Sequence, residues 1–283
     1  MMGYYNPAVA GSMPQMRVAA MAKMQWAGIT NAPSSFVVLG DMPMKVLGNT
    51  AGLGLSLFNE AIGLYNNTTV GVQLSLPIKL AGGVLSVGIQ PGLFNQTWRG
   101  TDVKIPESDK TDPNDPAIPT TDLEAMAFDF GMGLYYLRGP LYVAASSMHV
   151  LEQTVMLDEN IETYVARSYY FASGYNIPIR GTLFEVEPSV MVMSTILETS
   201  CNVQAQLVYN KLFSGGLNWR IGSAACLFLG AKLGKFRVGY AYDLPTNELL
   251  RGTAGSHEVF LRYEVDVKLD KNKNKRYKSV RIL

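Results

Sequence analysis

The sequence lacks any apolar run long enough to cross a membrane as a helix. Such a span needs about 18 or more consecutive apolar residues. None occurs, although 48% of the 283 residues are hydrophobic. The uncharged stretch Val46–Asn59 is interrupted by glycine, serine, threonine and asparagine. A helical membrane span is therefore excluded.

Charge is also scarce. Only 17% of the residues are charged, against about 25% in average soluble proteins. The formal net charge of +1 indicates no acidic partner for the chain as a whole, and we find no phosphate-binding loop or basic patch for nucleic acid. The opening residues MMGYYNPAVAGS have neither the basic nor the apolar region of a signal peptide. We therefore expect a mature start, with any signal peptide already removed.

Alternation with a period of two residues is present almost everywhere. In Val70–Ile78 one face is aliphatic and the other is small or polar, and Val259–Val267 alternates in the same way. A soluble sandwich would show a charged face to water. Here the polar face is mainly Gly, Ser, Ala, Gln and Asn, which suits a crowded lumen with the aliphatic face against lipid. Hydrocarbon cannot satisfy an open sheet edge, so the sheet must close.

The fold class is therefore all-β, a transmembrane antiparallel up-and-down β-barrel of about fourteen strands. Even parity is expected for a bacterial barrel formed by one chain, and twelve or sixteen strands are the alternatives. The expected strands lie near 18–30, 35–42, 50–60, 68–78, 83–95, 124–137, 139–149, 167–178, 181–195, 199–211, 214–222, 225–233, 235–243 and 255–268. Aromatic residues are expected to form girdles at the two membrane interfaces; they include Trp26, Trp219, Tyr169, Tyr170, Tyr240 and Tyr263.

Loop lengths predict the orientation. The connections Gln96–Leu123, Val150–Ala166 and Leu244–Ala254 follow odd-numbered strands and are long, whereas those after strands six, eight, ten and twelve are tight. Long external loops and short periplasmic turns are typical of outer-membrane barrels. We therefore expect an outer-membrane location, in contact with outer-membrane lipids, with both termini in the periplasm.

Three segments follow from this pattern. Residues 1–17 are expected to form an N-terminal periplasmic or plug segment, 18–268 the barrel, and 269–283 a basic periplasmic tail. A tail of this charge can be a solvated remnant, or it can dock on a partner or on anionic headgroups. The candidate partner-binding residues are Lys271, Lys273, Lys275, Arg276, Lys278 and Arg281.

Charged residues on expected lumen faces are interpreted as ion-paired struts, with a conduction path as the alternative. They are Glu185, Glu187, Arg220, Arg237, Arg262 and Glu264. We expect Arg237 to lie roughly across from Glu264 on the last strand, because a lone charge in the lumen would be costly.

The residue types of a hydrolytic triad occur at Ser256, His257, Glu258 and Asp243. Alternation along a strand puts His257 on the face opposite Ser256 and Glu258, so we expect no catalytic site and no enzyme activity. No histidine, cysteine and carboxylate cluster has the spacing of a metal site, and no cofactor is expected.

Cys201 and Cys226 are expected to remain free thiols. They lie on strands separated by a third, and two strand spacings make about 9.6 Å. This exceeds the usual separation of about 4.4–6.8 Å between the Cα atoms of a disulfide.

Seven phrases in order resemble one family. NPAVAGS at Asn6–Ser12 resembles that family's NPAxxGS, and QWAGI at Gln25–Ile29 resembles its QWxGI. Further similarities lie at Gly52–Leu55 (GLGL), Glu187–Ser189 (EPS), Gly216–Arg220 (GLNWR), Gly239–Asp243 (GYAYD) and Gly255–Val259 (GSHEV). The chain therefore resembles the PorP/SprF family of type IX secretion system outer-membrane proteins, although its basic extension runs past the family's usual end.

The resemblance implies a barrel that secretes or surface-anchors proteins, some of them gliding adhesins. Its implied partners are a periplasmic ring, a peptidoglycan-linked lipoprotein, and secreted cargo with a C-terminal secretion domain. The motifs do not separate a core secretion component from a cargo-dedicated paralogue. We expect a docking platform for ring components and cargo; the alternative is a fourteen-stranded passive channel or hydrophobic-solute transporter.

Overall fold

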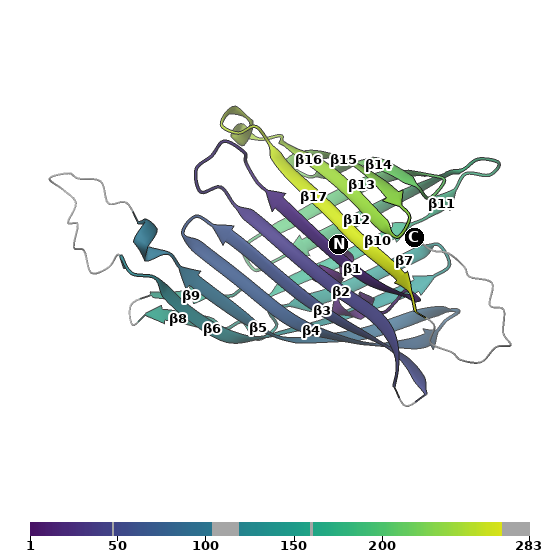
Figure 1. Cartoon of the computed structure of the whole chain (residues 1–283), viewed down its shortest axis with the longest axis horizontal. Coiled ribbons are helices and arrows are strands. Elements are labelled where there is room, and N and C mark those ends of the chain that lie inside the picture. Colours follow the sequence, from purple (N-terminus) through teal and green to yellow (C-terminus); the bar gives the residue numbers. More distant parts are fainter. Residues whose placement is uncertain (47, 104–118, 159–160, 268–283) are drawn as a thin grey trace.

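A computed structural model describes residues 1–46, 48–103, 119–158 and 161–267. In this part of the chain, fourteen antiparallel strands form one closed sheet (Figure 1). The barrel strands are β1 (Gln15–Met24), β2 (Ser34–Val46), β3 (Asn49–Ile62), β4 (Tyr65–Leu80), β5 (Gly83–Trp98), β6 (Leu123–Arg138), β7 (Leu141–Met148), β10 (Ser168–Tyr175), β12 (Phe184–Ser194), β13 (Thr199–Tyr209), β14 (Phe213–Arg220), β15 (Ala224–Leu233), β16 (Phe236–Pro245) and β17 (Ser256–Asp266). The fold class and the strand number predicted from the sequence are confirmed.

Two pairings close the barrel. The first and last strands are antiparallel neighbours, with Gln15 opposite Asp266 and Met24 opposite His257. The pairing of β10 with β12 completes the ring, and the two-residue strand β11 (Ile177–Pro178) extends the same edge of β12. The other ring neighbours follow one another in the chain, as in an up-and-down barrel, and only between β7 and β10 do the separate strands β8 and β9 intervene.

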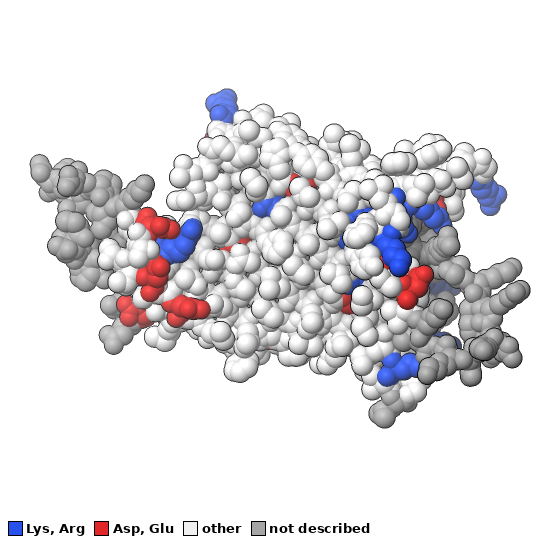
Figure 2. Space-filling model, viewed as in Figure 1, with Lys and Arg blue, Asp and Glu red and all other residues white. Residues whose placement is uncertain are grey.

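The two faces of the wall differ as the alternation predicted. On β4, Leu74 and Leu76 are 43% and 59% exposed, whereas the residues that alternate with them, Gln73 and Ser75, are 2% and 3% exposed. Charged side chains gather at two ends of the face seen in Figure 2, and the wide area between them carries few. An aliphatic outer belt of this kind is the surface that faces lipid in a membrane barrel.

The connections differ in length at the two ends of the barrel. The end that holds Gln15 and Asp266 has tight turns of two or three residues, such as 81–82 and 139–140, and one longer connection, 176–183, which contains β11. The opposite end carries the three long connections, one with the 3-10 turn η2 (Gly100–Asp102) and one with η3 (Glu248–Arg251). The third contains a small hairpin of β8 (Thr154–Asp158) and β9 (Ile161–Tyr164).

Several strand limits were wrong. β2 ends at Val46 and β3 begins at Asn49, whereas the sequence predicted a strand that ends at residue 42 and a next strand that begins at residue 50. The first strand ends at Met24, two residues before Trp26, which adopts a positive φ of 50°.

Cys201 and Cys226 are both free, as predicted. No helix in the described residues is long and apolar enough to cross a membrane.

Candidate functional site in the barrel lumen

The first twelve residues lie inside the barrel. They form a short helix α1 (Met2–Tyr5) and the 3-10 turn η1 (Pro7–Val9). The Ser146 hydroxyl donates to the carbonyl oxygen of Tyr5 at 2.6 Å, and the Ser75 hydroxyl donates to that of Ala10 at 2.6 Å. We call residues 1–12 the lumenal segment.

Asn6 anchors the middle of the lumenal segment. Its Oδ1 accepts from the backbone N–H of Ala8 at 2.9 Å, and its Nδ2 donates to the carbonyl oxygen of Leu134 on β6 at 2.9 Å. The side chain therefore caps the η1 turn and ties it to the wall at once. Asn6 is 2% exposed, so its replacement would leave buried polar groups without partners.

Glycines on the wall make room for the lumenal segment. A Cβ added to Gly52 would lie 1.9 Å from the carbonyl oxygen of Ala10, and one added to Gly88 would lie 2.3 Å from the nitrogen of Ala8. A Cβ at Gly133 would lie 2.1 Å from Oδ1 of Asn6. Two of these clashes are with backbone atoms of the segment, so only glycine allows this approach.

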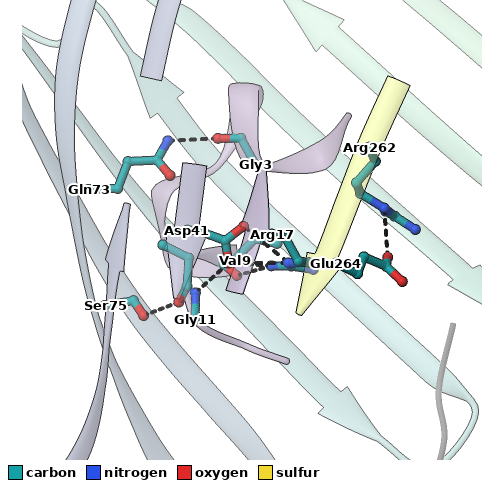
Figure 3. A network of polar contacts seen from close by, with 10 residues as sticks. Gly3, Val9, Gly11, Arg17, Asp41, Gln73, Ser75, Arg262 and Glu264 are labelled. Atoms are coloured by element: carbon teal, nitrogen blue, oxygen red, sulfur yellow. Dashed lines mark hydrogen bonds and ion pairs between the residues drawn. The ribbon is translucent and has the colours of Figure 1, made fainter. Parts of the chain in front are cut away.

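A charged pair fixes the end of the lumenal segment (Figure 3). Nη2 of Arg17 on β1 donates to Oδ2 of Asp41 on β2 at 2.6 Å, and Nε donates to Oδ1 at 3.0 Å. The same carboxylate accepts the N–H of Gly11 at 2.9 Å, and Nη2 of Arg17 reaches the carbonyl oxygen of Val9 at 3.2 Å. On the other side of the segment, Nε2 of Gln73 donates to the carbonyl oxygen of Gly3 at 2.7 Å.

Aromatic rings hold the start of the lumenal segment. The ring of Tyr4 lies 4.7 Å from that of Phe58, and the ring of Tyr5 lies 4.9 Å from that of Tyr170. The assignment of Tyr170 to an interfacial girdle is therefore wrong, because its ring faces the lumen beside Tyr5. Its neighbour Tyr169 is 48% exposed on the outer face.

The lumenal segment leaves a cavity of about 430 Å³ beside β12 to β17. Its wall carries charges of both signs at the loop end. There Nζ of Lys23 lies 2.9 Å from Oδ2 of Asp243, and Nη2 of Arg220 lies 3.8 Å from the same oxygen. The lumen is thus occupied on one side and hollow on the other.

The six charges predicted to line the lumen are placed on inward positions, and most have partners. Nε of Arg262 lies 2.7 Å from Oε1 of Glu264 (Figure 3). Glu185 lies 3.5 Å from Nζ of Lys211, and Nδ2 of Asn176 donates to Glu187 at 2.9 Å. These pairs act as the struts expected from the sequence.

The expected position of Arg237 is corrected by the strand register. Arg237 is paired with Arg262, and the N–H of Glu264 donates to the carbonyl oxygen of Lys235 instead. β16 and β17 are joined by the long connection 246–255 and not by a tight turn, so the sequence left an offset of two residues between these strands open. Arg237 therefore faces a like charge across the strands.

The triad-type residues do not assemble. Ser256 and Asp243 are opposite each other and buried, and the Ser256 hydroxyl accepts the N–H of Trp26 at 3.1 Å. His257 lies on the other face, where Nδ1 is 2.7 Å from the hydroxyl of Tyr240. Within the described ranges, no group of three His, Cys, Asp or Glu could hold a metal ion.

The six basic tail residues from Lys271 to Arg281 lie outside the described residues. The contacts that the sequence reasoning missed are those of Asn6, Gln73, Asp41 and Lys23. NPAVAGS and the GLGL phrase that begins at Gly52 both stand out as motifs, but nothing in the sequence indicates that they pack against each other, as they do here.

A closed antiparallel barrel with an aliphatic belt and a polar lumen is the fold of outer-membrane proteins. Solved structures share it at low identity. Omp33 of Acinetobacter baumannii matches with a TM-score of 0.51 and 8% identity over 89% of this chain and 98% of that one. A FadL homologue of Pseudomonas aeruginosa gives 0.51 and 8% over 92% of each, and the toluene transporter TbuX of Ralstonia pickettii gives 0.53 and 10% over 93% and 92%.

No curated protein matches the sequence. The family described as type IX secretion system membrane protein PorP/SprF matches residues 1–263. The chain belongs to the PorP/SprF family, as its motifs predicted. The match includes the lumenal segment as well as the strands.

Proposed function

We propose that this barrel is a non-enzymatic docking platform of the type IX secretion system, which holds periplasmic ring components and exported cargo at the outer membrane. The observation that carries the proposal is the lumen occupied by the chain's own first twelve residues. A passive pore needs a continuous water-filled path, whereas a platform does not. Glycines on three strands accommodate this segment, which indicates that occupancy is part of the fold.

The short-turn end is the proposed periplasmic face, because β1 begins and β17 ends on that side while residues 1–12 fold back into the lumen. Short turns are periplasmic in outer-membrane barrels. Basic residues at this end include Lys79, Arg138, Arg180, Lys211 and Lys235, and the tail adds more. The loop end instead carries acidic residues that include Asp102, Asp122, Glu152 and Glu248. A basic periplasmic face supports docking on an acidic surface of a ring or a peptidoglycan-linked lipoprotein.

The test is recovery of partners from membranes at equal barrel abundance. We compare the full chain, a chain that lacks residues 270–283, and a full-length chain with its six basic tail residues changed to glutamine. We expect both variants to insert normally and to recover less periplasmic partner at low salt, with the difference reduced at high salt by screening.

The glutamine variant separates charge from chain length. If only the truncation lowers recovery, the tail acts through length or assembly and not through charge. Unchanged recovery in both variants at every salt concentration would show that the tail does not dock. Recovery of no secretion components by the full chain would contradict the platform itself.

The alternative is a passive channel or hydrophobic-solute transporter, and the observation that favours it is the remaining cavity of about 430 Å³. TbuX, with the same fold, is described as a toluene transporter. Lys23, Arg220 and Asp243 in the cavity wall do not suit an uncharged aromatic solute, because burying charges against an apolar ligand is costly.

A further inference from the structure

The cavity beside β12 to β17 is bordered by the start of the lumenal segment, at Met1. Its volume of about 430 Å³ lies within the range of small-molecule sites, about 300–1,000 Å³. The charges at its loop end are balanced, because Lys23 and Arg220 both approach Asp243 and Glu258, which also lines the cavity, lies opposite Lys23 on β17. The charges at its turn end are not.

Three guanidinium groups meet at the turn end, on neighbouring strands. Arg17 is bound by Asp41 through two oxygens, whereas Nε of Arg262 lies 2.7 Å from Oε1 of Glu264 without forming a hydrogen bond. The positive charges of Arg17 and Arg237 both act on Arg262. Like charges directly opposite each other on paired strands are destabilising, and Arg237 and Arg262 are such a pair.

Arg237 is the unmatched member. Among the described residues no carboxylate lies within 4.0 Å of Arg237, and the buried Nε atoms of Arg237 and Arg262 both lack a hydrogen-bond partner. Glu187 attracts it only from a greater distance, and Asn176 already holds the Glu187 carboxylate. In the same cavity, the buried Oδ1 of Asn218 also lacks a partner.

Apolar side chains line the space next to the guanidinium groups of Arg237 and Arg262. Phe228, Phe260 and Met21 all face the cavity, and the guanidinium carbon of Arg262 lies 5.8 Å from the centre of the Phe260 ring. A bare inorganic anion would match the charge but would leave this apolar surface in contact with water. A ligand with a charged head and an apolar body matches both.

We propose that the cavity binds an organic carboxylate, whose head group bridges Arg237 and Arg262 and whose apolar body lies against Phe228 and Phe260. The arginine fork accepts a carboxylate through two parallel hydrogen bonds. One negative charge between the two guanidinium groups also offsets their repulsion. This inference does not depend on the docking role.

The test uses the full chain in detergent and radiolabelled benzoate as the probe, with empty micelles as the blank for partitioning. Equilibrium dialysis gives the dissociation constant. Inorganic phosphate and benzyl alcohol are the competitors, the first with charge alone and the second with the ring alone. The variants are Arg237→Gln, Arg237→Lys and the exposed-turn control Arg180→Gln, each checked for a folded barrel by heat-modifiable gel migration.

We expect saturable binding of benzoate at one site. Arg237→Gln should weaken it by about tenfold or more through loss of a charged hydrogen bond, Arg237→Lys should weaken it less, and Arg180→Gln should leave it unchanged. Absence of saturable binding would overturn the proposal, as would equal competition by phosphate or by benzyl alcohol. If Arg237→Gln does not fold, the lysine variant decides: binding equal to that of the parent chain would then refute the role of the fork.

Discussion

Gly52 shows how one missing side chain positions a distant segment. A Cβ at residue 52 would lie 1.9 Å from the carbonyl oxygen of Ala10. It would also lie 2.4 Å from the Ser75 hydroxyl oxygen, which binds that carbonyl. Gly52 therefore permits both the close approach and the hydrogen bond that secures it. The contact links two motifs that are separated by about forty residues in the sequence.

We predict that Gly52→Ala displaces the lumenal segment and destabilises the barrel by about 1–3 kcal/mol, the usual cost of overpacking. Limited chymotrypsin digestion followed by mass analysis should then detect cleavage after Tyr4 or Tyr5, which the parent chain protects. The control is Gly40→Ala, because nothing lies within 4 Å of a Cβ at Gly40. Equal protection of the tyrosines in both variants would contradict the contact.

The pair of Arg17 and Asp41 gives a second test at this scale. Arg17→Gln or Asp41→Asn should each cost about 1–3 kcal/mol, because each leaves a partly buried charge without its partner. The double variant should cost less than the sum of the two, as expected for residues in contact. The measurement is a double-mutant cycle of urea unfolding in detergent, and additive costs would show that the pair is not coupled.

The sequence could predict which residues face inward more reliably than which of them meet. Alternation places Arg237, Arg262 and Glu264 on one side of the wall, and the structure agrees. Their register depends on the long connection 246–255 between β16 and β17, whose path the sequence does not determine. Asn6 could not be assigned a partner at all, because its contact with Leu134 is 128 residues away.

At the scale of elements, the strands extend beyond the limits read from the sequence. β4 spans Tyr65–Leu80 where 68–78 was expected, because the alternating pattern weakens at polar strand ends while backbone pairing continues. The hairpin of β8 and β9 was missed within a predicted loop. Val155 and Leu157 in β8 are 2% and 7% exposed, so this connection packs on the barrel and contributes to its buried surface.

The long connections are predicted to face outside the cell. A tag at Asn114, in the connection between β5 and β6, should be reached by antibody or protease added to intact cells. A matched tag in the Ile179–Thr182 turn should be reached only after the outer membrane is opened. Labelling of the second tag but not the first would invert the orientation and place the basic tail outside.

At the scale of the whole molecule, the closed barrel was predictable because lipid imposes two strong conditions on sequence, alternation and closure. The path of the lumenal segment was not, since it depends on backbone approaches at Gly52, Gly88 and Gly133 that have no periodic signal. The resemblance to the family supplied the secretion role, which no pattern of strands and loops contains. The fold is thus a consequence of the membrane.

Single-channel conductance in a planar bilayer tests the central proposal, that residues 1–12 obstruct conduction through the lumen. We predict that the full chain inserts without stable conducting steps and that a chain lacking residues 2–12 gives discrete open channels, because no other described segment occupies that side of the barrel. Heat-modifiable migration of both proteins is the control for folding. Large, steady conductance of the full chain, unchanged by the deletion, would contradict the account and favour a passive channel.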